Sequence, residues 1–165
     1  MQANVKLQDT INLYIMELIA KDLEAVISQY RSALKSLDES RLAHKPSPSK
    51  WSKKELIGHM IDSAQSNIRR FIVAQYEEIP TINYNQDKWV AIAGYQQWNS
   101  NDLIDLWYLL NRQICEILKN TSPEAAQRQC MTEELHTIEW LAQDYIKHLK
   151  HHMYQVLELE PVAYP

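Results

Sequence analysis

The sequence predicts an all-α protein, a four-helix bundle. Apolar residues recur at helical spacing over four long segments, and no segment alternates apolar and polar residues as a half-buried strand does. Only 2 of the 165 residues are glycine and 6 are proline, which suits long helices better than a turn-rich β-sandwich. A chain of this length can bury a core of its own, so we expect one domain over residues 1–165.

The first predicted helix covers about residues 7–37, where a broad apolar face extends from Ile11 to Ile27. The polar stretch after it contains Pro46 and Pro48, and two prolines so close together exclude a continuing helix. The first helix therefore ends before this stretch.

The second predicted helix begins at Ser52 and continues to about Tyr76. Ser52 and Glu55 have the spacing of a capping box, in which each side chain accepts a hydrogen bond from the backbone N–H of the other residue. This spacing marks the start of the helix sharply.

A long connection, residues 77–98, follows the second helix, and a short helix within it is expected to stop at Gly94. The third helix is predicted over residues 102–119, with Ser100 or Asn101 as its cap. The connection exceeds the 2–8 residues that usually join antiparallel bundle helices. Either the flanking helices are joined by a crossover, or the connection packs as a lid. Its aromatic residues favour a packed segment: Tyr84, Trp89, Tyr95 and Trp98.

The fourth predicted helix covers about residues 137–159, with Thr137 as its cap and a short helical turn near Pro123 before it. His148 and His152 stand four residues apart in this helix, so both imidazoles project from one face. On a helical wheel, His152 lies within the apolar stripe and His148 on its flank. Burying an unpaired polar group costs roughly 1–3 kcal/mol, so both side chains need partners. They form either a hydrogen-bonded pair at the edge of the core or two ligands of a divalent metal.

Composition excludes several classes of function. The net charge of −4 argues against a nucleic-acid partner, and no apolar run approaches the roughly 20 residues of a membrane span. The N-terminal segment lacks the charged-then-apolar order of a signal peptide, so a cytoplasmic protein is expected. Cys115 and Cys130 lie too far apart in sequence for a zinc knuckle or a redox pair.

A third candidate ligand, His59, lies on the second predicted helix at the edge of its apolar face. On that helix the pattern is Trp51, Glu55, His59, Asp62, Asn67 and Arg70, and the run HLKHHMYQ follows near the C-terminus. This combination resembles the DinB superfamily, which includes the YfiT-type metal-dependent proteins. The resemblance implies that His59, His148 and His152 hold one divalent metal ion. It also implies an up-down-down-up bundle, and homodimers are common in the superfamily.

Three neutral imidazoles would leave coordination positions open, as in catalytic rather than structural sites. The superfamily that the chain resembles includes thiol transferases. The leading function that this resemblance implies is a metal-dependent enzyme that transfers a low-molecular-weight thiol to an electrophilic small molecule. A metal-dependent hydrolase is the alternative enzyme. A non-catalytic stress-response module that binds metal without turnover is the competing function outside the enzymes. Nickel, zinc and iron are the candidate ions. Asp62, Arg70 and His151 are expected to support the ligands or to orient the substrate.

Overall fold

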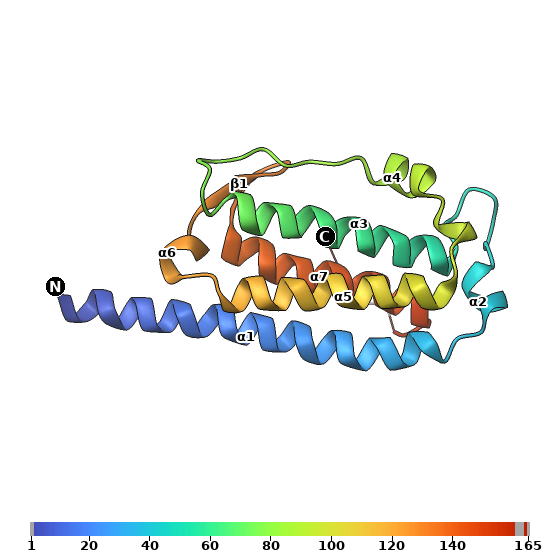
Figure 1. The fold of residues 1–165 in the computed structure, drawn as a ribbon, viewed down its shortest axis with the longest axis horizontal. Coiled ribbons are helices and arrows are strands. Elements are labelled where there is room, and N and C mark those ends of the chain that lie inside the picture. The colour runs from blue at the N-terminus through green and yellow to red at the C-terminus, as the bar shows by residue number, and fades with distance from the viewer. Residues whose placement is uncertain (1, 161–163, 165) are drawn as a thin grey trace.

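Four long helices form the bundle of the described part of the chain (Figure 1). The computed structural model describes the backbone of residues 2–160 and residue 164, with side chains from Ile15 onward. α1 and α7 run in one direction and α3 and α5 in the other, which is the up-down-down-up order that the resemblance implies. The bounds of the long helices are α1 (Gln2–Lys35), α3 (Lys53–Val73), α5 (Ser100–Lys119) and α7 (Ile138–Leu157).

The core lies where these helices meet, because α1 and α3 each pack against both α5 and α7. Trp107 and Phe71 are the largest side chains within it that are fully buried. Burial of one such side chain contributes roughly 1.5–3 kcal/mol, so the packing of α3 on α5 and α7 is strongly favoured. α3 is thereby fixed beside α7, which positions the candidate site.

The helix starts follow the local sequence signals. Ser52 and Glu55 form the predicted capping box of α3, and the Thr137 side chain caps α7 by accepting a hydrogen bond from the Trp140 N–H. The predicted start of α5, residue 102, was two residues too late, and the predicted caps were one or two residues too late. The cap of α5 is Asn99, whose side chain accepts from two backbone N–H groups of the first turn, so the helix already begins at Ser100.

The long connection joins two parallel helices, α3 and α5, and it also packs on the bundle. It contains α4 (Gln86–Ala93), which ends at Gly94 in the left-handed conformation (φ 64°), and the short 3-10 helix η1 (Tyr95–Gln97). The Tyr95 ring lies directly against Gly58 of α3, where an added Cβ atom would be 2.0 Å from the ring. Glycine at this position lets the connection approach α3 closely.

The structure adds elements that the sequence pattern did not reveal. A short helix, α2 (Glu39–Ala43), lies within the polar stretch after α1, and the strands β1 (Gln129–Met131) and β2 (Leu135–Thr137) form an antiparallel hairpin before α7. Three-residue strands are too short to show alternation. The helical turn expected near Pro123 is present as α6 (Pro123–Ala126). Within the described part of the chain, no helix is both long enough and apolar enough to span a membrane.

Candidate metal centre

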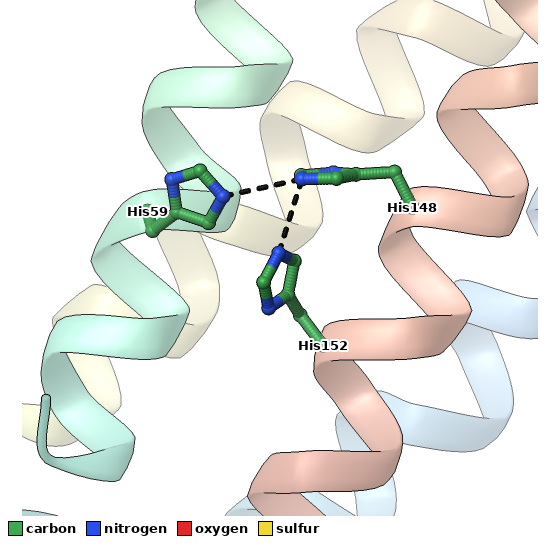
Figure 2. A group of neighbouring side chains, drawn as sticks. All are labelled: His59, His148 and His152. Atoms are coloured by element: carbon green, nitrogen blue, oxygen red, sulfur yellow. Dashed lines mark hydrogen bonds between the residues drawn. The ribbon is translucent and has the colours of Figure 1, made fainter. Parts of the chain in front are cut away.

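Three histidine side chains from two helices point toward one another (Figure 2). His59 projects from α3, and His148 and His152 project from consecutive turns of α7. The Nε2 atom of His148 lies 3.2 Å from that of His59 and 3.1 Å from that of His152. One ligand atom from each of the three lies within 4.8 Å of the other two. We call these residues the histidine triad.

These separations suit a shared metal ion. With metal–nitrogen distances of about 2.0–2.1 Å, neighbouring ligands are about 3.4 Å apart in a tetrahedral site and about 3.0 Å apart in an octahedral one. Hydrogen bonds among the rings alone cannot explain the cluster. The His148 Nε2 atom faces two other Nε2 atoms, yet a neutral imidazole nitrogen either donates one hydrogen bond or accepts one. A cation would accept the lone pairs of all three nitrogens.

The outward-facing ring nitrogens show how two of these imidazoles are oriented. His148 Nδ1 lies 3.5 Å from the Ser63 hydroxyl, and His152 Nδ1 lies 3.1 Å from Oε1 of Gln155. A proton on these Nδ1 atoms leaves the Nε2 lone pairs free for a metal. His59 Nδ1 is buried and has no hydrogen-bond partner among the described residues. The Trp51 ring packs beside His59, with 5.2 Å between ring centroids.

Burial keeps the triad in the neutral form that metals bind. His59 is only 1% exposed, and burial, together with the nearby His152, lowers its pKa to about 3. Burial is also the main cause that lowers the pKa of His148 to about 2, helped by the other two histidines. The pKa of His152 is lowered too, mainly by burial. All three imidazoles therefore offer lone pairs at neutral pH.

On the wheel, His152 lies within the apolar stripe of α7 and His148 on its flank. In the structure both side chains are half-buried, and each ring contacts the His59 ring, with centroid distances of 5.1 Å for His148 and 4.7 Å for His152. His152 also contacts the exposed Gln155. The apolar stripe faces the whole core, whereas the position of the triad depends on where α3 crosses α7.

The other sequence-predicted residues lie in different places. Asp62 is buried (2% exposed), and its Oδ1 atom accepts a 2.5 Å hydrogen bond from the Tyr95 hydroxyl. Its Oδ2 atom has no hydrogen-bond partner among the described residues, so Asp62 does not hold a ring of the triad. Burial raises the pKa of Asp62 to about 6. His151 is half-buried beside the triad, with its ring centroid 5.1 Å from that of His152. Arg70 lines the same cavity as His148.

Two cavities adjoin each other, and His148 lines the smaller of them. The smaller, here called the inner chamber, has a volume of about 120 Å³. The larger, here called the outer cleft, has a volume of about 1020 Å³ and shares Arg70, Tyr84, Leu141 and Asp144 with the inner chamber. The inner chamber is lined by those four residues and by Ser63, Asn67, Tyr145, His148 and Tyr164. The remaining lining of the outer cleft comes from residues 83, 85–87 and 132–134, His136 and Trp140.

Comparison with known proteins identifies the family. The model of the DinB superfamily matches residues 22–156, which is most of the chain. The chain belongs to the DinB superfamily.

Relatives within this family carry names that refer to metal. The chain is 23% identical over 141 residues to "Putative metal-dependent hydrolase YfiT" of Bacillus subtilis (strain 168), covering 83% of this chain and 79% of that protein. It is 27% identical over 84 residues to a "Putative metal-dependent hydrolase" of Bacillus mycoides (strain KBAB4). That second match spans 50% of this chain and about half, 49%, of the relative.

A solved DinB structure confirms the bundle. YfiT from Bacillus subtilis, described as having "an unusual four-helix bundle topology", superposes with a TM-score of 0.70 at 20% identity, over 93% of this chain and 86% of that one. At this identity, the likeness supports the fold. The family, the fold and the histidine cluster together indicate a site that can bind a divalent metal.

Sequence reasoning missed several residues around the triad. Ser63 lies four residues after His59, and Gln155 lies three after His152, so helical spacing could have found both. Asp144 also lies one helical turn before His148. Tyr164 had no such signal, because it lies beyond the end of α7, and only the tertiary structure places it at the chamber.

Proposed function

We propose that this DinB protein is a divalent-metal-dependent enzyme that acts on a small molecule. The convergence of three neutral imidazole Nε2 atoms beside a polar chamber is the observation that carries this proposal. A purely structural metal site would normally have four protein ligands. Among the described residues only three candidates meet here, and the adjoining space is large enough for other molecules.

The leading reaction is transfer of a low-molecular-weight thiol to an electrophile. The resemblance to thiol-transferring DinB proteins supports it. Cys115 and Cys130 are both buried and line neither cavity, so the sulfur would come from a substrate. A bound divalent ion would supply Lewis acidity, which lowers the pKa of a thiol or water molecule that it coordinates.

The chain's own residues would bind and orient the reactants. His59, His148 and His152 would hold the ion, and Ser63 and Gln155 would fix two of the rings. The apolar packing of Trp51 on His59 restricts access of water from that side. Substrate would enter through the outer cleft, because it adjoins the chamber that His148 lines.

Hydrolysis is the second candidate reaction, and one structural observation favours it. The Asp144 carboxylate lines the inner chamber together with His148, so it can accept a proton from a water molecule there. The names of the two Bacillus relatives support the same reaction.

Two measurements test the proposal in sequence. Untagged protein is purified and its metal content determined by mass spectrometry, with a His59→Ala variant as the metal-free control. Both proteins are then assayed for consumption of small thiols in the presence of a fluorogenic electrophile, and for cleavage of ester and amide substrates. We expect about one ion per chain and metal-dependent thiol consumption. Metal-dependent cleavage alone would favour the hydrolase. Bound metal without either activity would refute an enzyme and favour a binding module.

A further inference from the structure

A cationic side chain without a carboxylate partner lies beside the histidine triad. Arg70 is half-buried and lines both the inner chamber and the outer cleft. Its Nε and Nη2 atoms donate hydrogen bonds of 3.1 and 3.0 Å to the Ile82 carbonyl, and Nη1 donates one of 3.4 Å to Oδ1 of Asn67. No ion pair joins Arg70 to any carboxylate among the described residues.

These contacts leave part of the Arg70 guanidinium unused. A guanidinium has five N–H groups, and three of them account for the contacts with Ile82 and Asn67. One N–H on Nη1 and one on Nη2 have no partner among the described residues. Two guanidinium N–H groups recognise a carboxylate best, because its two oxygens can accept both hydrogen bonds. The Ile82 and Asn67 contacts hold the side chain in place, so little entropy is lost when an anion binds.

The opposite charge in the inner chamber belongs to Asp144. Its Oδ2 atom accepts a 2.9 Å hydrogen bond from the Tyr164 hydroxyl. Asp144 lines the same two cavities as Arg70, but no described nitrogen of Arg70 lies within ion-pair distance of it. The two charges thus face a common space without neutralising each other directly. Such a chamber offers one anionic and one cationic binding position.

The size and charge of the cavities restrict the ligand further. At about 120 Å³, the inner chamber holds the equivalent of about four water molecules, at about 30 Å³ each. The outer cleft adds the acidic residues Asp87, Glu133 and Glu134, with Arg70 as the only lysine or arginine in its described lining. This negative potential opposes the entry of a simple anion. A molecule that carries both charges has no net charge and avoids that penalty.

We propose that the inner chamber binds a small zwitterion of the amino-acid type, with its carboxylate on Arg70 and its ammonium group toward Asp144. This inference rests on the proposed function. His148 lines the same chamber, so the zwitterionic group of a substrate would anchor that substrate beside the triad. Binding of the zwitterion itself depends on Arg70 and Asp144 and not on the metal.

The first test uses three probes of similar size: glycine carries both charges, acetate only the carboxylate, and glycinamide only the ammonium group. Each is titrated into the full-length protein, as purified and again after chelator treatment, and binding is followed by NMR of the backbone amides. We expect glycine to bind at least fivefold more tightly than either analogue with the metal removed. The shifted amides should cluster at residues that line the inner chamber. Equal binding of acetate or glycinamide, or shifts elsewhere on the protein, would overturn the proposal.

Variants test the two charged positions. Arg70→Gln and Asp144→Asn should each weaken glycine binding by roughly 10- to 100-fold, because each removes a charged hydrogen-bond partner. Arg69→Gln is the matched control, since it removes the same charge from the exposed neighbouring position and should leave binding unchanged. An equal effect of Arg69→Gln would refute the assignment. Arg70→Lys, which keeps the charge but not the paired N–H groups, should lose part of the affinity.

The outcomes separate this inference from the proposed enzyme. If the Arg70 variants do not fold, the probe series on the unmodified chain still decides, because it reports both charge preference and location. Selective glycine binding without any turnover would support the proposed zwitterion site and refute the proposed enzymatic function. If the protein turns over substrate but does not distinguish glycine from acetate, the proposed enzyme is supported and the proposed zwitterion site is refuted.

Discussion

Lowering the pH of the metal-free protein should destabilise it through the histidine triad. Burial holds the pKa of His59 at about 3 and that of His148 at about 2 in the folded protein, whereas an unfolded histidine has a pKa of about 6.5. Between these values the unfolded chain binds protons that the folded chain does not. The stability that the neutral histidines contribute is therefore present above about pH 6.5 and is lost as the pH falls toward 3.

The expected loss can be calculated for one pH interval. From pH 6 to pH 5, an unfolded histidine carries on average about 0.9 of a proton, while His59 and His148 remain neutral in the folded protein. At about 1.36 kcal/mol per proton and pH unit, the two histidines together remove about 2.4 kcal/mol from the free energy of unfolding. This is a large part of the 5–15 kcal/mol that stabilises a typical domain.

Other groups titrate near this pH interval. The test therefore compares the loss of unfolding free energy between the unmodified protein and a variant without the two histidines. Asp62 acts with the opposite sign: burial raises its folded pKa to about 6, so this residue adds stability as the pH falls through that value. Carboxylates held by cations, such as Asp105 beside Lys35, have lowered pKa values and lose their contribution only at lower pH. A variant that lacks the two histidines retains all of these other effects.

The assay is urea unfolding in the presence of a chelator at pH 6 and pH 5. The unmodified protein should lose about 2.4 kcal/mol more over this interval than the double variant His59→Gln/His148→Gln. His44→Gln, at an exposed position, is the control and should behave as the unmodified protein. Equal losses in the double variant and the unmodified protein would refute the reasoning that burial keeps the triad neutral.

Three further outcomes follow from the structure. His152→Ala should abolish metal binding with little loss of helix, whereas His151→Ala should retain the metal. Mass spectrometry measures the metal content of both variants. An equal loss of metal in both would contradict the assignment of the triad. A metal ion present at 100 times its dissociation constant should add about 2.7 kcal/mol of stability and raise the melting temperature, while the chelated protein should remain folded by circular dichroism. Unfolding on chelation would instead make the metal structural. Gly58→Ala should cost roughly 1–3 kcal/mol in urea unfolding, because its Cβ atom would lie 2.0 Å from the Tyr95 ring; an unchanged midpoint would contradict that close packing.

Features that depend on neighbours along the chain could be predicted from the sequence. The capping box of Ser52 and Glu55 and the Thr137 cap of α7 are set by hydrogen bonds within one helical turn. The shared face of His148 and His152 follows from helical geometry alone. The short strands β1 and β2 were not predicted, because they are stabilised by pairing with each other and with the backbone of residues 80–82 rather than by a local pattern.

What the sequence by itself determined is therefore the helical class, most of the helix starts and the presence of two histidines on one face of α7. Its position at the edge of an apolar helix face made His59 a candidate, and the resemblance implied that it is the third ligand. Only the packing of α3 on α7 decided that its Nε2 atom lies 3.2 Å from that of His148. The inner chamber depends on tertiary structure even more strongly, because Arg70, Asp144 and Tyr164 come from three separate segments. Hydrogen bonds within a turn depend on adjacent residues, whereas contacts between helices depend on how complete apolar faces pack, and a single stretch of sequence does not contain that information.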